Sequence, residues 1–206
     1  MITKTKLDFS NVSTPAGDAI LMDKEIGWTS FDVIRVLRKI LNTRKIGHAG
    51  TLDPNATGLL IICTGKQTKK ISEFQNLGKT YTGVITLGAR TETYDTESDF
   101  IEQKGYEGIN EEHIESVRNT FIGKISQRPP MYSAVKHKGK PLYKYARKGI
   151  EIERIEREVI VNSFDIKKID LPDLYFEIEC SKGTYIRTLA DDFGNKLGCG
   201  AYLKEL

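Results

Sequence analysis

LYFEIEC, residues 174–180, places an apolar side chain at every second position from Leu174 to Cys180. The positions between them carry tyrosine or glutamate. Strict alternation of this kind is typical of a strand with one buried face and one face in solvent. The stretch therefore predicts a strand in a sheet that is covered on one side.

Other segments predict elements on both sides of this strand. Further strands are expected at residues 19–24 (AILMDK), 57–65 (TGLLIICTG) and 79–89 (KTYTGVITLGA). Helices are expected at about residues 29–41, 67–74, 110–120, 142–147 and 184–197. The three longest helices have apolar residues at helical spacing, which we predict to be buried: Phe31, Ile34, Leu37 and Leu41; Ile114, Val117 and Phe121; Ile186, Leu189, Ala190, Phe193 and Leu197.

The order of these elements predicts the fold class. Strands do not alternate regularly with helices, which disfavours a doubly wound parallel sheet. We predict an α+β fold with a mixed, mainly antiparallel sheet flanked by helices. At 206 residues one domain is expected, at residues 18–206, preceded by a loosely ordered tail at residues 1–17.

Composition and apolar runs favour a cytoplasmic protein. The longest uninterrupted apolar run is Leu59 to Cys63, far short of the roughly 20 residues that span a bilayer. The first 18 residues contain no apolar core of the kind that a secretory signal needs. The chain has three cysteines, an odd number without a C-x-x-C pair. We therefore expect buried thiols at Cys63 and Cys180 rather than a disulfide framework. The three histidines are scattered, so no metal site is expected.

Charge is distributed unevenly along the chain. Nine acidic residues and one lysine lie between Glu92 and Glu115, whereas six basic residues and no acid lie between Lys136 and Lys148. Blocks of like charge are often solvated faces. The basic block also contains tyrosines, and this mixture suits binding to nucleic acid through phosphate contacts and base stacking.

The loop GHAGTLDPNATG, residues 47–58, is the candidate site of chemistry. Its glycines and small residues let a ligand approach the backbone closely, and it presents one carboxylate, Asp53. That carboxylate could cap its own turn, or act as a nucleophile, an acid–base group or a metal ligand. His48 is expected to protrude from the same loop, although a lone histidine is more often structural.

An aspartyl phosphotransferase is an alternative interpretation of this loop. Residues 53–57, DPNAT, resemble a D-x-D-x-T motif, but Asn55 stands at the second acidic position and no apolar strand directly precedes the motif. A magnesium ion there would lack one anionic oxygen ligand.

A catalytic aspartate must stay ionised and correctly oriented. A neighbouring arginine favours the charged form and can hold it by a bidentate contact. The candidate is Arg187 in CSKGTYIRTLADDFG, residues 180–194. Spacing alone leaves open that Arg187 is a surface residue of the predicted helix.

Four motifs in order resemble one known family. GHAGTLDPNATGLLIICTGKQTKK, KTYTGVITLGARTETYD, RPPMYSAVKHKGKPLYKYARKGIE and CSKGTYIRTLADDFG are similar to segments of the TruB family, the bacterial tRNA pseudouridine-55 synthases. Together with their neighbourhood they cover most of residues 19–203. The resemblance implies the pseudouridine synthase fold. It also implies isomerisation of one uridine in the tRNA T loop to pseudouridine, without cofactor or metal.

The resemblance assigns roles to individual residues. It implies that Asp53 is the essential catalytic aspartate, that Tyr81 stacks on the flipped-out uracil, and that Arg187 pairs with Asp53. His48 would help to fill the space that the flipped base leaves. Tyr185 and Asp95 also match positions of the family and are expected to bind substrate. Lys136 and Lys138 are expected to bind substrate as part of the basic segment. Whether Asp53 attacks the uracil, attacks the ribose or promotes elimination stays open.

Three features differ from the family pattern. Asn55 stands where leucine is common, and Glu25 stands where proline is usual. The chain also stops at GAYLKEL, where family members usually continue with the end of the catalytic domain and often a PUA domain. We therefore expect a C-terminally short member, and an RNA-binding module without catalysis is the second hypothesis. A monomer is expected because no heptad pattern is present.

Overall fold

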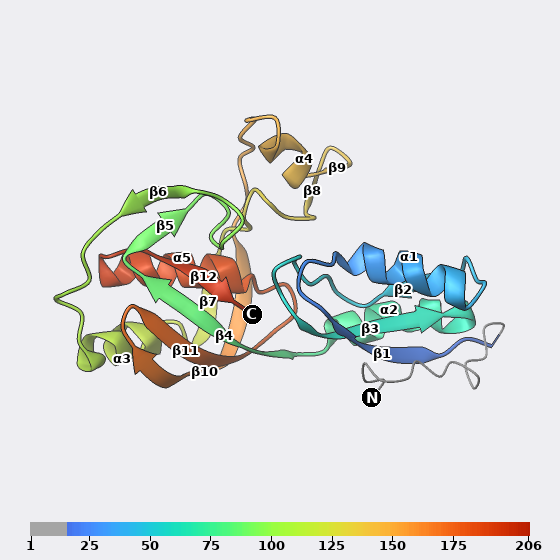
Figure 1. Ribbon diagram of the computed structural model, residues 1–206, viewed down its shortest axis with the longest axis horizontal. Coiled ribbons are helices and arrows are strands. Elements are labelled where there is room, and N and C mark those ends of the chain that lie inside the picture. Colours follow the sequence, from blue (N-terminus) through green and yellow to red (C-terminus); the bar gives the residue numbers. More distant parts are fainter. Residues whose placement is uncertain (1–15) are drawn as a thin grey trace. The chain divides into compact units, whose positions relative to one another are not determined.

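The computed structural model describes residues 16–206, and within them the chain divides into two compact units. One unit extends to Leu77 and the other runs from Gly78 to Leu206. The predicted tail at residues 1–17 lies almost entirely outside the described residues. Figure 1 gives the element labels.

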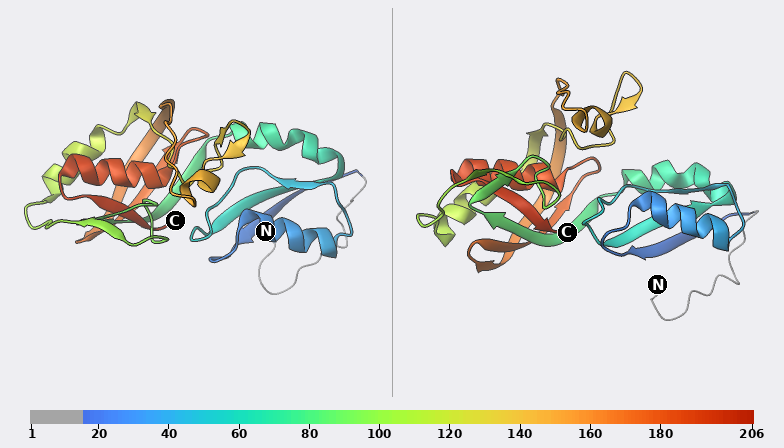
Figure 2. Two further views of the ribbon diagram at one scale, coloured as in Figure 1. Left: turned by 90° about the horizontal axis from the view of Figure 1, so that it is seen from above. Right: turned by 45° about the horizontal axis from the view of Figure 1, so that its top comes forward.

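The first unit is a three-stranded antiparallel sheet with helices on its faces. Its strand order is β1-β3-β2. The elements are β1 Ala19–Lys24, α1 Ser30–Ile40, β2 Ile46–His48, β3 Gly58–Thr64, the 3-10 helix η1 Gly65–Lys70 and α2 Ile71–Asn76. Figure 2 shows α1 and α2 on opposite faces of this sheet.

Helix α1 begins where its sequence predicts. Thr29 is the N-cap, and its side chain and that of Asp32 form a reciprocal capping box, which satisfies two free backbone N–H groups. The apolar face packs on the sheet through Val33, Ile34 and Leu37. The prediction for Phe31 was wrong, since it is 58% exposed. It lies two positions before Val33, on the solvent side of the helix.

The second unit is built on a five-stranded antiparallel sheet with the order β12-β4-β11-β10-β7. Its strands are β4 Lys79–Leu87, β7 Gly123–Gln127, β10 Arg157–Asp170, β11 Asp173–Cys180 and β12 Ala201–Glu205. Two small hairpins join β5 Ala89–Thr91 to β6 Phe100–Gln103, and β8 Lys136–His137 to β9 Lys140–Pro141. The helices are α3 Glu111–Asn119, α4 Tyr143–Ala146 and α5 Ile186–Leu197.

The core of the second unit lies between this sheet and α3 and α5. The alternation in β11 is confirmed, because Leu174, Phe176, Ile178 and Cys180 are all at most 2% exposed. The ring of Phe193 in α5 packs at a tilt against two other rings. Its centroid lies 5.9 Å from that of Phe121, which follows α3, and 5.6 Å from that of Phe164 in β10. Such buried aromatic contacts fix how the helix lies on the sheet. The predicted α+β class with mainly antiparallel sheets flanked by helices is therefore confirmed.

Within residues 16–206, no helix is both long enough and apolar enough to cross a bilayer. The three cysteines are buried and free, as predicted for Cys63 and Cys180. Of the nine acidic residues between Glu92 and Glu115, only Asp95 is buried, at 4% exposure, and the others are exposed or half-buried.

Candidate active site

Asp53 lies in the loop between β2 and β3 of the first unit, and it is partly buried. Its carbonyl oxygen accepts a hydrogen bond of 3.1 Å from the backbone N–H of Ala56, which closes a turn over the Asp-Pro-Asn sequence. Gly50 and Gly58 flank the loop with φ values of 111° and 105°. These values favour glycine and explain why the loop can turn away from both strands.

The segment from Lys24 to Ser30 holds this loop on both sides of Asp53. The Ser30 hydroxyl accepts from the N–H of Leu52 at 3.0 Å and is 3.1 Å from its carbonyl oxygen, to which it donates. The Pro54 carbonyl accepts from Gly27 N–H at 2.8 Å. Hydrogen bonds thus hold the backbone one residue before and one residue after the aspartate, and they restrict the position of Asp53.

Lys24 contributes a buried charge beside the loop. It is 1% exposed, and its Nζ donates to three carbonyl oxygens: those of Glu25 at 3.0 Å, Trp28 at 2.7 Å and Pro54 at 3.3 Å. Burial lowers the pKa of Lys24, and the negative charge of Asp53 partly opposes that shift. The attraction is mutual, so the ammonium group favours the ionised carboxylate.

Sequence reasoning missed Lys24. A lysine at the end of an apolar strand gives no local sign that it will be buried, and its partner Pro54 is 30 residues away.

His48 ends β2 and is half-buried. Its Nδ1 lies within hydrogen-bonding reach of the Gly50 carbonyl oxygen. The ring therefore turns back onto its own loop, which differs from the fully protruding side chain expected from the sequence. A donor role for Nδ1 would leave Nε2 as the nitrogen able to accept.

Arg187 lies in the first turn of α5 in the second unit and is 6% exposed, so the surface alternative for this residue was wrong. Its guanidinium donates to the carbonyl oxygens of Thr93 and Tyr132, both at 2.9 Å. It also forms an ion pair of 3.4 Å with Asp95. Arg187 is thus rigidly held, and its predicted pairing with Asp53 of the other unit stays a prediction.

Asp95 is part of a buried turn. Its Oδ1 accepts from the Thr93 hydroxyl at 2.5 Å and from the Glu97 N–H at 2.9 Å, which leaves Oδ2 toward Arg187. The Thr91 hydroxyl donates to its carbonyl oxygen at 2.7 Å. These contacts orient the carboxylate toward the arginine.

The two predicted tyrosines are in the second unit. Tyr81 lies in β4 opposite Ile178 of β11, and it is half-buried against the core. Tyr185 precedes α5, and its backbone is bound by the side-chain amide of Gln127. Sequence reasoning did not single out Gln127.

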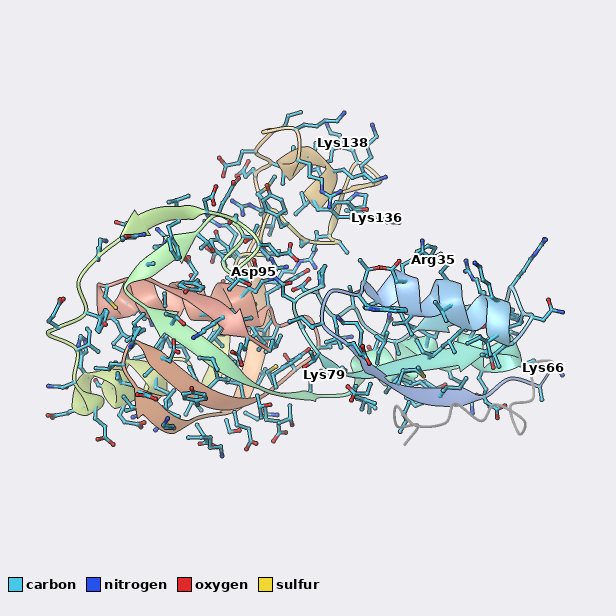
Figure 3. The ribbon with its side chains drawn as sticks, viewed as in Figure 1. Arg35, Lys66, Lys79, Asp95, Lys136 and Lys138 are labelled. Carbon is cyan, nitrogen blue, oxygen red and sulfur yellow. The ribbon has the colours of Figure 1, made fainter. Side chains whose placement is uncertain are left out.

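Lys136 and Lys138 lie on the β8–β9 hairpin, and both are exposed (Figure 3). The turn residues Lys138 and Gly139 have φ values of 48° and 80°, a pattern typical of a two-residue hairpin turn. Tyr145 of α4 packs edge-on against His137 at 5.9 Å. The basic segment is therefore a folded lobe that presents its lysines to solvent.

The structure groups the candidate residues by unit. His48 and Asp53 belong to the first unit, and Tyr81, Asp95, Lys136, Lys138, Tyr185 and Arg187 belong to the second. Among residues 16–206, no cluster of three or more histidine, cysteine or acidic side chains is suited to hold a metal ion.

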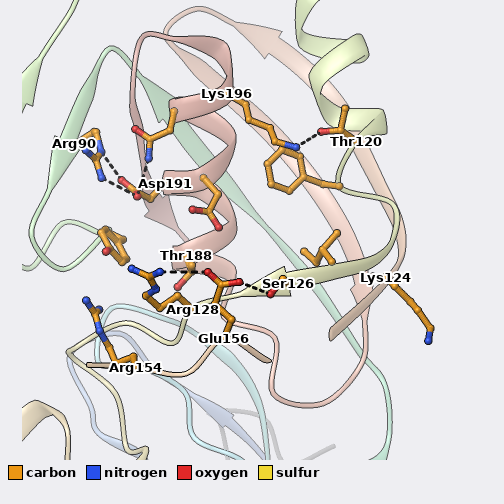
Figure 4. A pocket seen from close by; sticks show the side chains of 15 residues that line it. Arg90, Thr120, Lys124, Ser126, Arg128, Arg154, Glu156, Thr188, Asp191 and Lys196 are labelled. Atoms are coloured by element: carbon orange, nitrogen blue, oxygen red, sulfur yellow. Dashed lines mark hydrogen bonds and ion pairs between the residues drawn. The ribbon is translucent and has the colours of Figure 1, made fainter. Parts of the chain in front are cut away.

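A polar pocket of about 810 Å³ lies in the second unit beside α5 (Figure 4). At its wall Arg90 binds Asp191 through two contacts of 2.7 and 3.0 Å. Burial, followed by the charge of Asp191, raises the pKa of Asp192 to about 6. Sequence reasoning did not predict this pocket, because its lining comes from four separate parts of the chain.

Comparison with known proteins defines the class. A sequence model described as "TruB family pseudouridylate synthase (N terminal domain)" matches residues 38–186. The chain therefore belongs to the TruB family of pseudouridylate synthases, which are isomerases.

Relatives and solved structures agree with this assignment. A protein of Chloroherpeton thalassium named "tRNA pseudouridine synthase B" is 46% identical over 205 residues, covering 97% of this chain and 85% of the relative. One of the same name from Chlorobium chlorochromatii is 48% identical, with 93% and 77% covered. The solved "Cbf5-Nop10-Gar1 Complex" contains a chain 32% identical with a TM-score of 0.70, covering 91% of this chain. The present chain spans 46% of that solved chain.

Proposed function

We propose that this protein converts uridine 55 in the T loop of tRNA to pseudouridine, with Asp53 as the essential catalytic residue. The observation that carries the proposal is the similarity to relatives named tRNA pseudouridine synthase B over more than 90% of the chain. Family membership leaves no support for the phosphotransferase alternative. In the proposed reaction the N1–C1′ bond breaks, C5 bonds to C1′, the hydrogen on C5 leaves as a proton, and N1 gains a proton.

The surroundings of Asp53 support its proposed role. The loop backbone is held at Leu52 and Pro54 by contacts from the segment 24–30. A preorganised carboxylate needs little rearrangement when it reacts. The ammonium group of Lys24 favours its ionised form, in which it can act as a nucleophile or a base.

The remaining residues are proposed to bind and orient the flipped uridine. Tyr81 stacks on the uracil and assists proton removal, Tyr185 contacts it, and His48 occupies the space that the base vacates. Arg187 holds Asp53 ionised in this proposal. Because Asp95 is buried and faces Arg187, we propose that it orients this arginine and does not itself bind substrate.

Lys136 and Lys138 are proposed to contact T-arm phosphates, which positions the RNA without reading its sequence. We further propose that residues 18–206 act as one catalytic domain, as a monomer, without cofactor or metal. The cytoplasm is the proposed location, because tRNA is matured and used there.

The test compares the parent chain with Asp53→Asn on a T-arm stem-loop. We expect Asp53→Asn to lose turnover while its affinity for the stem-loop stays within about twofold, since the change removes a reacting group and not a phosphate contact. Asp23→Asn, an exposed aspartate on β1 of the same unit, is the matched control and should keep both. Equal loss of binding and turnover in Asp53→Asn would contradict the proposed role. Normal binding without turnover in the parent would favour the RNA-binding module.

A further inference from the structure

Gln127 is a buried side chain with an unusual pair of contacts. It ends β7 and is 2% exposed. Its Oε1 accepts from the backbone N–H of Tyr185 at 2.8 Å, and its Nε2 donates to the carbonyl oxygen of Tyr185 at 3.0 Å. One amide thus binds the N–H and C=O groups of a single residue 58 positions away.

These contacts lie at the start of α5, where the helix has no side-chain cap of its own. The first N–H groups of a helix lack partners within the helix. The Tyr185 carbonyl already accepts the first helical bond, from the N–H of Leu189 at 3.0 Å. The amide of Gln127 therefore adds a second donor to this carbonyl and supplies the acceptor that the N–H needs.

The chain that follows Gln127 also holds the next functional side chain. Five residues on, the carbonyl oxygen of Tyr132 accepts from the guanidinium of Arg187 at 2.9 Å. Residues 127–132 thus bind Tyr185 through its backbone and Arg187 through its side chain. Tyr185 is proposed to contact the uridine and Arg187 to hold Asp53 ionised, and Gln127 is the buried anchor of that segment.

We propose that Gln127 is a positioning residue for pseudouridine formation, because its amide fixes the orientation of the turn from Tyr185 to Arg187. The inference rests on the proposed function for its catalytic consequence. The fixed pair of contacts needs a planar group that donates on one side and accepts on the other, which a side-chain amide provides. Loss of this anchor lets the turn shift, and a displacement of about 1 Å at a catalytic group can cost roughly 100-fold in rate.

Replacing the amide with a carboxyl gives a specific test. An ionised carboxylate only accepts hydrogen bonds, so it cannot donate to the Tyr185 carbonyl. A protonated carboxyl both donates and accepts, in nearly the shape of the amide. Gln127→Glu should therefore lose activity at high pH and regain it as the carboxyl is protonated.

Charged groups on the flanking elements set the conditions of the test. They are Arg128, which follows Gln127, Glu156, which accepts from Ser126 and Arg128, Arg157, the cross-strand partner of Gln127 on β10, and Arg187, Asp191 and Asp192 on α5. The arginines stay charged throughout. The pKa of Asp192 is raised to about 6, so it titrates in parent and variant alike. The quantity to compare is therefore the ratio of variant to parent kcat at each pH.

The experiment measures kcat and KM with varied concentrations of a T-arm stem-loop between pH 5.5 and 8, with circular dichroism confirming the fold at each pH. We expect kcat of Gln127→Glu to be about 100-fold below the parent at pH 8. We expect the ratio to recover by roughly tenfold or more at pH 5.5, because burial raises the pKa of a carboxyl. Gln127→Met, whose thioether cannot donate a hydrogen bond and accepts only weakly, should show no recovery. Gln103→Glu, an exposed glutamine of the same unit, should match the parent.

Two results would overturn the inference. One is a Gln127→Glu ratio that does not change with pH, and the other is a change confined to KM. Where Gln127→Glu unfolds at pH 8, the comparison is made at pH 5.5, where its kcat must exceed that of Gln127→Met. An inactive parent would contradict the proposed function instead. In that case the readout is hydrogen exchange at the amides of residues 185–187. Gln127→Glu must show less protection than the parent at pH 8 and regain it at pH 5.5.

Discussion

The buried ion pair between Asp95 and Arg187 allows a sharp test of how the second unit holds its arginine. Asp95→Asn keeps an oxygen at the position of Oδ1, which accepts from the Thr93 hydroxyl and the Glu97 N–H. Only Oδ2, which faces Arg187 at 3.4 Å, is replaced by an NH₂ group. The substitution therefore preserves the turn and places a donor against a buried cation.

We expect this change to lower the free energy of unfolding by about 3 to 5 kcal/mol, the usual cost of leaving a buried charge without its partner. Both side chains are at most 7% exposed, so solvent screens them little. The assay is urea denaturation followed by circular dichroism. In a double-mutant cycle, Asp95→Asn combined with Arg187→Met should be more stable than the sum of the single changes predicts, by about 1 to 3 kcal/mol.

Asp99→Asn is the matched control for this cycle. Asp99 is exposed and lies four residues further along, so its substitution should change stability by less than about 0.5 kcal/mol. A loss below about 1 kcal/mol for Asp95→Asn, or strict additivity in the cycle, would refute the reasoning.

Three further predictions concern the loop, the pocket and the basic lobe. Ser30→Ala removes both contacts to Leu52 and should cost about 1 to 3 kcal/mol of stability, with a fall in kcat measured on the stem-loop. Asp192→Asn should stabilise the protein at pH 8 by up to about 3 kcal/mol, since the folded-state pKa of about 6 lies above the unfolded value near 3.8 and ionisation therefore opposes folding. This gain, measured by urea denaturation, should vanish below pH 4. Replacing Lys136 and Lys138 together with alanine should weaken RNA binding and reduce the slope of log affinity against log salt by about 2.

Each of these predictions has an opposing outcome. If Ser30→Ala leaves both the free energy of unfolding and kcat unchanged, the contacts to Leu52 do not hold the loop in place. A stabilisation by Asp192→Asn that is equal at pH 4 and pH 8 would contradict the raised pKa. For the lysines, the control is Lys167→Ala with Lys168→Ala, which removes two cations of β10 already paired with acids. An equal loss of salt dependence in both pairs would argue against a specific RNA contact by the lobe.

Helices and strands with a strong apolar periodicity lie at the residues that the sequence predicts. Strand β1 occupies residues 19–24 as predicted, and α3, capped by Asn110, lies within the predicted range 110–120. The error at Phe31 arose because Val33 offers an equally good helical spacing, and tertiary packing chose between the two. Strand β12 was missed because five residues of mixed character carry little periodicity, and pairing with β4 decides their conformation.

The candidate site was predictable only in part, for a similar reason. Asp53 stands out because glycines surround it, and resemblance to a family supplies the other candidates. Lys24 and Gln127 had no such signal. Their roles come from contacts to residues 30 and 58 positions away, which no local pattern encodes. The long-range partner, not the residue type, makes a buried lysine or glutamine part of the site.

The most direct measurement is tritium release from a T-arm stem-loop labelled at C5 of uridine 55 alone. Isomerisation must expel that hydrogen when C5 bonds to C1′. The proposed function predicts nearly complete release by the parent chain and none above background by Asp53→Asn, with both proteins folded and bound to the RNA. Release by both proteins would contradict the role of Asp53, and release by neither would contradict the proposed reaction.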